Sequence, residues 1–113
     1  MRDNSNGPKF RDKKMEEVLR ELASKFLLVE ASGQSLITVT HVKVSSDLKY
    51  ATIYFTSYPT DSEKFALDFA KRKRAEFRDF VKDNSRLGRI PFMDFEIDLG
   101  ERNRQLIDNL SQM

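Results

Sequence analysis

ITVTHVKVSSDLKYATIYFTSY, residues 37–58, predicts a β-hairpin, and the rest of the fold is built around it. Two runs rich in β-branched and aromatic residues, 36–45 and 48–57, flank a short polar turn around Ser46-Asp47, which is typical of paired antiparallel strands. In the second run, apolar residues alternate with tyrosine and threonine. One face of the hairpin is therefore expected in the core and the other at the surface.

The first strand of this hairpin changes phase along its length. Ile37 and Val39 fall on odd positions, whereas Val42 falls on an even one. A one-residue bulge near Thr40-His41 would return all of these side chains to the same face. We expect His41, the only histidine, to be a bulge residue rather than a ligand, because histidine tolerates left-handed backbone angles.

Helical periodicity appears on both sides of the hairpin. A first helix is predicted over residues 10–29, and its apolar stripe comprises Met15, Val18, Leu19, Leu22, Ala23, Phe26 and Leu27. A second is predicted over residues 61–84, with Thr60 and Glu63 at capping-box spacing. Its stripe comprises Phe65, Ala66, Phe69, Ala70, Phe77, Phe80 and Val81. The stripe skips the turn at Lys73, so this helix is expected to pack by its two ends.

The C-terminal third of the chain predicts one more strand and one more helix. Residues 91–98 alternate between apolar and acidic, Asp98 and Glu101 resemble a helix start, and a short last helix follows, supported by Leu106, Ile107 and Leu110. The order α-β-β-α-β-α predicts an α+β domain with a three-stranded mixed sheet. Because the third strand follows a helical crossover, it is expected to lie parallel to a neighbour. Helices are expected on one face of the sheet, with the other face open.

Composition limits the organisation and the possible chemistry. The 113 residues suit one domain over 9–113, preceded by a flexible arm at residues 1–8 (MRDNSNGP). The chain has no cysteine, which excludes disulfides and thiolate metal sites and fits a reducing cytosol. The longest aliphatic run is too short for a membrane span, and no signal peptide precedes it. A cytoplasmic protein without a membrane partner is expected.

Charge is distributed unevenly along the chain. The net charge is +2, but residues 71–89 carry eight Lys/Arg against three Asp/Glu, and residues 1–14 carry five against two. Two basic blocks on a mildly acidic body indicate a polyanionic partner on one side of the molecule. A solvated charged helix face is the alternative explanation of the same pattern.

Neither catalysis nor cofactor chemistry is indicated. No nucleophile–base pair or phosphate-cradling glycine loop is present, so we expect no enzyme, no cofactor and no small-molecule substrate. Asp94, Glu96 and Asp98 alternate along one strand and resemble a Mg²⁺ set, but such residues are more often the wet face of a sheet. Tyr50 and Tyr54 would form, with Thr52 between them, an exposed strip that suits a protein or stacked bases.

Three segments at matching spacings resemble the bacterial ribosome-binding factor A family. They are the hairpin ITVTHVKVSSDLKYATIYFTSY, the C-terminal run RLGRIPFMDFEIDLGERNRQLIDNL (residues 86–110) and KKMEEVLRELASKF (residues 13–26) in the first helix. The resemblance covers residues 9–112 and implies a type II KH-like domain. It implies a monomeric, non-enzymatic factor that binds the free small (30S) ribosomal subunit and assists 16S ribosomal RNA processing and late assembly, with a link to growth in the cold. The alternative is a general KH-like RNA-binding module without a ribosomal role.

The resemblance also indicates where RNA would bind. KH domains clamp nucleotides with a Gly-x-x-Gly loop, which in this family is reduced to Ala-x-Gly at a helix kink. The motif falls on Lys73-Arg74-Ala75. Alanine stabilises a continuous helix by about 1 kcal/mol relative to glycine, so the sequence leaves open whether the helix kinks here. Cationic side chains would then hold the RNA phosphates, in place of a close approach of the protein backbone to the RNA. The predicted RNA-binding residues are Lys71, Arg72, Lys73, Arg74 and Arg78, then Arg86 and Arg89, with a second hold from Lys9, Arg11, Lys13 and Lys14.

Overall fold

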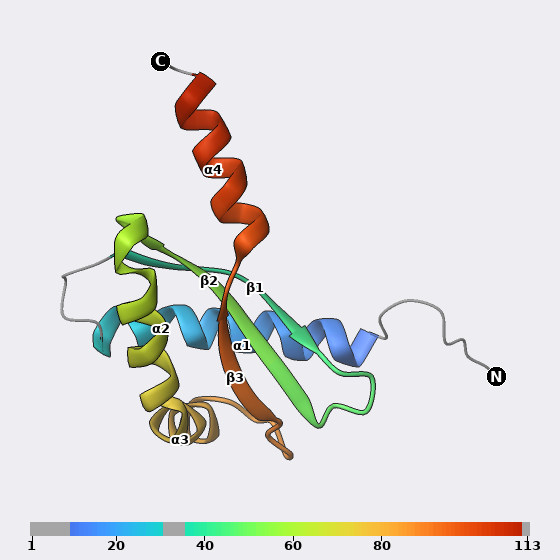
Figure 1. Cartoon of the computed structure of the whole chain (residues 1–113). Coiled ribbons are helices and arrows are strands. Elements are labelled where there is room, and N and C mark those ends of the chain that lie inside the picture. The colour runs from blue at the N-terminus through green and yellow to red at the C-terminus, as the bar shows by residue number, and fades with distance from the viewer. Residues whose placement is uncertain (1–9, 31–35, 112–113) are drawn as a thin grey trace.

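The computed structural model describes residues 10–30 and 36–111, with side chains for 13–28 and 36–107. The predicted arm at residues 1–8 lies outside the described residues. Within these residues, four α-helices, three strands and one 3-10 turn form one sheet with the first three helices packed against it and the last helix projecting from it (Figure 1). In chain order they are α1 (Phe10–Glu30), β1 (Leu36–Val44), β2 (Tyr50–Tyr58), η1 (Thr60–Ser62), α2 (Glu63–Arg72), α3 (Arg74–Asn84), β3 (Phe92–Ile97) and α4 (Leu99–Ser111).

The sheet is mixed, as predicted. Its strand order is β1-β2-β3, with β1 antiparallel and β3 parallel to β2. Val39 faces Phe55 and His41 faces Tyr54, so the extra residue of the bulge is Thr40. The bulge is confirmed, but His41 is paired and takes no left-handed angle; among the described non-glycine residues the positive φ belongs to Leu48, at 62° in the hairpin turn.

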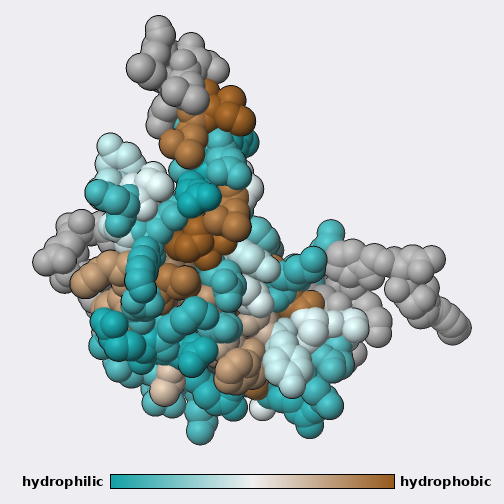
Figure 2. Space-filling model, in the orientation of Figure 1, coloured by the Kyte–Doolittle hydropathy of each residue, from teal (hydrophilic) through white to brown (hydrophobic). Residues whose placement is uncertain are grey.

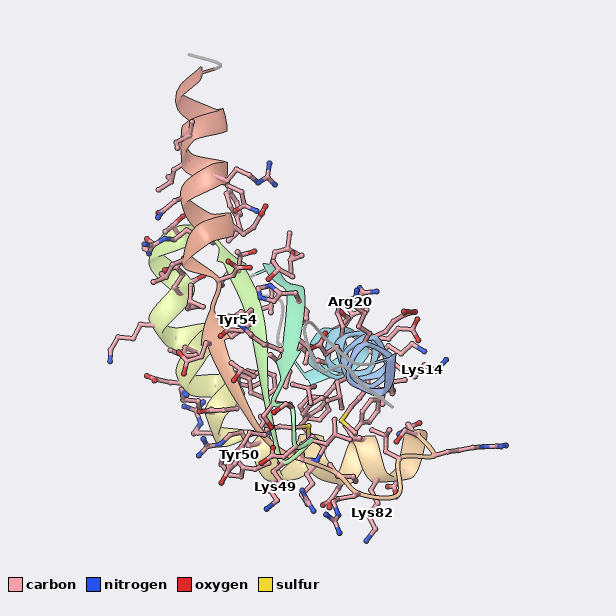
Figure 3. The ribbon with its side chains drawn as sticks, turned by 90° about the vertical axis from the view of Figure 1, so that its right-hand side faces the viewer. Lys14, Arg20, Lys49, Tyr50, Tyr54 and Lys82 are labelled. Atoms are coloured by element: carbon pink, nitrogen blue, oxygen red, sulfur yellow. The ribbon has the colours of Figure 1, made fainter. Side chains whose placement is uncertain are left out.

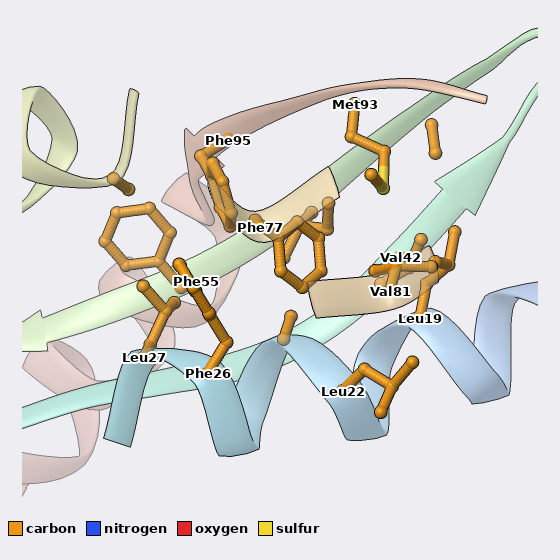
Figure 4. Close-up of a cluster of buried hydrophobic side chains, with 14 of the residues drawn as sticks. Leu19, Leu22, Phe26, Leu27, Val42, Phe55, Phe77, Val81, Met93 and Phe95 are labelled. Atoms are coloured by element: carbon orange, nitrogen blue, oxygen red, sulfur yellow. The ribbon is translucent and has the colours of Figure 1, made fainter. Parts of the chain in front are cut away.

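Side chains from one face of the sheet and from α1 and α3 form the core (Figure 4). Phe77 of α3 lies at its centre, with its ring centroid 5.3 Å from that of Phe26 on α1 and 5.6 Å from that of Phe95 on β3. Each such side chain stabilises the fold by roughly 1.5–3 kcal/mol when fully buried. This apolar layer fixes α3 and β3 relative to each other, and with them the junction between α2 and α3.

The second helix is broken in the middle. Lys73, with φ −96° and ψ 10°, separates α2 from α3, and α3 runs in a new direction (Figure 1). The backbone N–H of Lys73 donates to the carbonyls of Phe69 and Ala70, and the N–H of Phe77 donates to the carbonyl of Lys73 at 2.8 Å. The break therefore forms without glycine, because Ala70 and Phe77 are both buried on either side of it.

Two expectations for the start of this helix are wrong. Neither Thr60 nor Glu63 forms the capping box, since neither the 3-10 turn nor α2 has a side-chain cap; Glu63 instead accepts from Arg102 of α4 at 3.0 Å. Phe65 was expected in the buried stripe but is 61% exposed. Ala66 makes the contact with the sheet, and Phe65, about 100° round the helix from it, faces outward.

The last helix, α4, projects from the end of β3 away from the body (Figure 1). Asp98 caps it as expected, since its Oδ1 accepts the backbone N–H of Glu101 at 3.0 Å. Leu106 and Ile107 are nevertheless exposed, and the side chain of Leu110 lies outside the described set. Figure 2 shows hydrophobic residues along α4. In the described part of the chain, no helix is long and apolar enough to cross a membrane.

Candidate nucleic-acid interface

The junction of α2 and α3 forms one wall of a cationic hollow of about 340 Å³, and the start of β3 forms the other. Its lining residues are Lys71, Arg72, Arg74, Ala75, Arg78, Phe92 and Met93. Four of the five cations predicted in the basic turn, which comprises residues 71–74 and Arg78, are thus brought to one concave site. The break at Lys73 makes this possible, because a straight helix would distribute consecutive side chains around its axis.

A carboxylate holds two of these cations, which the sequence did not predict. Asp94 Oδ1 lies 2.8 Å from Lys71 Nζ and 3.1 Å from the Arg74 guanidinium, and Glu96 lies 3.5 Å from Lys71 Nζ. Burial raises the pKa of Asp94, but hydrogen bonds from Lys71 and the Phe95 backbone N–H outweigh it and hold the pKa below the ordinary value. Lys71 and Arg74, which the sequence predicts as RNA-binding residues, are therefore held by carboxylates and do not point freely outward.

The other cations of the turn differ in their surroundings. Lys73 Nζ lies 3.3 Å from Glu76 and 5.8 Å from the ring centroid of Phe69. Arg78 donates to the carbonyl of Ile90 at 3.2 Å and so fastens the loop after α3. Arg72 is exposed, and among the described residues it has no ion pair or hydrogen-bond partner. It is the cation of the hollow best placed to bind an external phosphate.

Arg86 and Arg89 lie in the loop between α3 and β3. Both side chains are exposed, and no described carboxylate pairs with either. Arg78 fastens the end of this loop to α3 through the carbonyls of Ile90 and Pro91. Neither Arg86 nor Arg89 lines the hollow.

The predicted second hold on α1 forms a separate surface. Lys9 lies outside the described residues, as does the side chain of Arg11, whereas Lys13 and Lys14 are exposed. Lys13 lines a shallow hollow of about 550 Å³ between α1 and β1 that Glu16 and Glu17 also line, so its charge is mixed. Lys14 and Arg20 project from α1 on the side of the molecule away from α2 (Figure 3).

The family model for ribosome-binding factor A matches residues 11–111 of the chain. The chain belongs to the ribosome-binding factor A family. A ribosome-binding factor A from Thermosipho melanesiensis is 31% identical, over 93% of this chain and 92% of the relative.

Solved structures of ribosome-binding factor A share the fold. The crystal structure of the protein from Thermus thermophilus superposes with a TM-score of 0.68 at 20% identity, covering 76% of this chain and 94% of that one. A homology model of the Thermus thermophilus protein, fitted into a cryo-EM map of a 30S complex, gives 0.63 at 18% identity, covering 80% and 93%. The α+β fold with its mixed three-stranded sheet is therefore the KH-like fold of ribosome-binding factor A.

Phe92 lines the cationic hollow, although the sequence did not predict it there. It is 57% exposed, and its ring centroid lies 5.9 Å from the guanidinium carbon of Arg74. The strand alternation contained the signal: Met93 and Phe95 point inward, so Phe92 had to point outward. An exposed aromatic ring beside cations is a feature that RNA-binding surfaces use.

The acidic residues of β3 pair with cations, and Asp98, which follows the strand, caps the next helix. Asp94 and Glu96 face Lys71, whereas Asp98 accepts from the Thr40 hydroxyl and lies 3.2 Å from Nδ1 of His41. Burial raises the pKa of Asp98, but hydrogen bonds from Thr40 and the Glu101 N–H outweigh it and lower the pKa below the ordinary value. Among the described residues, no group of three or more His, Asp or Glu side chains is placed to hold a metal ion.

Proposed function

We propose that this chain binds the free small (30S) ribosomal subunit and assists 16S ribosomal RNA processing and late subunit assembly. The observation that carries the proposal is the cationic hollow at the helix break, on a chain of the ribosome-binding factor A family. The Thermus thermophilus relative of the same fold has been fitted into a map of a 30S complex, which supports the same partner for this chain.

The geometry suits phosphate contacts of two kinds. Arg72, Arg86 and Arg89 are exposed guanidinium groups that donate directly to phosphate oxygens. Lys71 and Arg74 are fixed in the wall of the hollow by Asp94 and meet a phosphate only by exchanging this carboxylate for it. Phosphate contacts of this kind position a protein on RNA, and the shape of the folded RNA supplies specificity.

Cosedimentation at several salt concentrations tests the proposal. The chain is expected to pellet with free small subunits more than with assembled ribosomes or bulk RNA. The logarithm of its affinity should fall with the logarithm of salt at a slope of about −0.7 to −0.9 per phosphate neutralised. Equal binding to bulk RNA would favour the general KH-like RNA-binding module, and binding insensitive to salt would contradict the electrostatic mechanism.

A cellular assay tests the role in maturation. In a bacterium lacking its own ribosome-binding factor A, expression of this chain should lower the level of precursor 16S ribosomal RNA, most visibly in the cold. The factor acts as a monomer in the cytoplasm under this proposal, and sedimentation equilibrium of the purified chain checks the monomer. Unchanged precursor levels, with normal binding to free subunits, would limit the function to binding.

A further inference from the structure

Two aromatic side chains lie side by side on the open face of the sheet, next to the cationic hollow. Tyr50 on β2 faces Phe92 on β3 in the parallel register, and they are 61% and 57% exposed. Their ring centroids are 6.3 Å apart, with the ring planes at 72°. An edge-on contact of this kind covers at most one face of one ring, so broad ring faces remain available to a partner.

The backbone holds both rings in place before any partner arrives. The N–H of Tyr50 donates to Ser45 Oγ at 3.0 Å, and the carbonyl of Tyr50 accepts from the N–H of Ser45 at 2.8 Å. The N–H of Phe92 donates to the carbonyl of Lys49 at 2.8 Å. The pair therefore sits on rigid sheet positions, which lowers the entropy cost of binding.

The neighbouring aromatic pair of the same face is arranged differently. His41 and Tyr54 are stacked face to face, with centroids 4.5 Å apart and planes at 12°, so each ring covers a face of the other. In Figure 3, Tyr50 lies with Lys49 at the hairpin end of the sheet, and Tyr54 lies farther along β2. The free ring faces are thus concentrated at the end where Phe92 enters the hollow.

Continuity with the hollow identifies the chemistry of the partner. Phe92 lines the hollow, and the guanidinium carbon of Arg74 lies 5.9 Å from its ring centroid. Exposed Lys49 precedes Tyr50 in the chain and lies at the same end of the sheet (Figure 3). Flat apolar rings bordered by cations match a nucleotide, whose base stacks while its phosphate meets the positive charge. A protein segment without acidic side chains would gain nothing from these cations.

We propose that Tyr50 and Phe92 form a stacking platform for unpaired bases of RNA whose phosphates lie in the cationic hollow. The inference rests on the proposed function, because it assumes that ribosomal RNA occupies the hollow. It adds a requirement: the RNA segment at this site is single-stranded, since paired bases do not expose their faces. Stacking of this kind tolerates any base.

A fluorescence experiment on the full chain tests the platform. The chain has no tryptophan, so Tyr50→Trp introduces a single reporter that keeps a stacking ring. Short single-stranded oligoadenylate should quench this fluorescence, and an abasic ribose-phosphate oligomer of equal length should not. Tyr58→Trp, at the other end of β2 and also exposed, is the control and should not respond. Equal responses to the two oligomers, or no response of Tyr50→Trp, overturn the platform.

An affinity experiment separates the platform from the proposed function. Tyr50→Ala and Phe92→Ala should each weaken oligoadenylate and subunit binding about tenfold, with the salt slope unchanged because no charge is lost. Tyr58→Ala should bind as the native chain does, and chemical unfolding checks that each variant is folded. If both variants bind normally while neutralised Arg72 and Arg89 weaken binding, only the platform is wrong. If Tyr50→Ala weakens subunit binding but oligoadenylate does not quench Tyr50→Trp, the surface contacts protein and the platform is again wrong.

Discussion

The cations of the basic block at residues 71–89 fall into two groups that differ in what holds them. Lys71 and Arg74 converge on Asp94, at 2.8 and 3.1 Å. Arg72 and Arg89 are exposed and pair with no described carboxylate. All four belong to the same basic block of the sequence. We call them the held cations and the open cations.

The comparison teaches that positive charge in a sequence differs from positive charge available to a ligand. A held cation must exchange its carboxylate for a phosphate, so its net contribution to binding is small. An open cation has only to exchange bound water for the phosphate. The held pair does structural work instead, because it ties α2 and the start of α3 to the edge strand β3 and so keeps the hollow open.

Neutralising the open cations should have the largest effect. The double variant Arg72→Gln with Arg89→Gln is expected to bind free small subunits roughly 25- to 60-fold more weakly at 0.1 M salt, since each phosphate contact contributes about five- to eightfold there. Unfolding free energy should change by less than about 0.5 kcal/mol, because both side chains are exposed. Filter binding and urea unfolding measure the two quantities.

The matched control for that variant is Lys64→Gln. Lys64 lies at the other end of α2, is exposed, and pairs with Asp68 only at 4.0 Å. It should leave subunit affinity within about twofold of native, the limit set by loss of distant charge alone. An equal loss with Lys64→Gln would mean that net charge, and not the placement of the open cations, governs binding.

Releasing the held cations should act in the opposite direction. Asp94→Asn removes the carboxylate from Lys71 and Arg74, and subunit affinity should rise by roughly fivefold, the value of one added phosphate contact. The salt slope should steepen at the same time. Asp83→Asn makes the same charge change on α3, where no described cation pairs with Asp83, and should do less. Weaker binding by Asp94→Asn would show that the carboxylate mainly positions Lys71 and Arg74 for binding and does not mainly compete with the phosphate for them.

Restoring the glycine of the family motif should affect stability more than binding. Ala75→Gly is expected to lower the unfolding free energy by about 0.5–1 kcal/mol, because glycine loses more backbone entropy in the first turn of α3. Subunit affinity should stay unchanged, since the break at Lys73 is already present. Thermal unfolding and filter binding provide the measurements, and markedly tighter binding would show that RNA approaches the backbone here.

Acidification should remove the stability that the ionised carboxylates of Asp94 and Asp98 contribute. The pKa values of Asp94 and Asp98 are lowered in the fold, so the unfolded chain takes up protons at a higher pH than the folded chain. Their stabilisation is fully present above the ordinary aspartate pKa of about 3.9 and is lost as the pH falls through the lower folded values. Near neutral pH no change is expected.

Thermal unfolding between pH 3 and pH 6 measures this effect, with Asp94→Asn as the comparison. That variant should lose stability less steeply below about pH 4, because one of the carboxyl groups with a lowered pKa no longer titrates. A slope identical to that of the native chain would assign the acid sensitivity to other carboxylates.

Local patterns in the sequence were enough for most of the fold. The phase change between Val39 and Val42 located the bulge, and the alternation after Pro91 located β3. The gap in the apolar stripe at Lys73 coincides with the break, although the sequence left open whether the helix breaks there. These predictions succeed because periodicity reports which face of an element is buried.

Predictions that depended on distant partners failed. Thr60 and Glu63 have the spacing of a capping box, but Glu63 pairs with Arg102, which lies 39 residues away. Phe65 fits the stripe by spacing, but the contact of α2 with the sheet needs only small side chains such as Ala66. The site residues divide in the same way: the basic block was predicted, whereas Phe92 and Asp94 were not assigned to the hollow.

The sequence by itself determined the elements, their order and the presence of a cationic turn, because these follow from local periodicity and composition. Only the tertiary structure decided which cations face solvent, because Asp94 is 20 residues from Arg74 along the chain. It reaches Arg74 when β3 pairs in parallel with β2 and the helix breaks at Lys73. Coulomb attraction depends on distance in space, and sequence periodicity does not encode that distance.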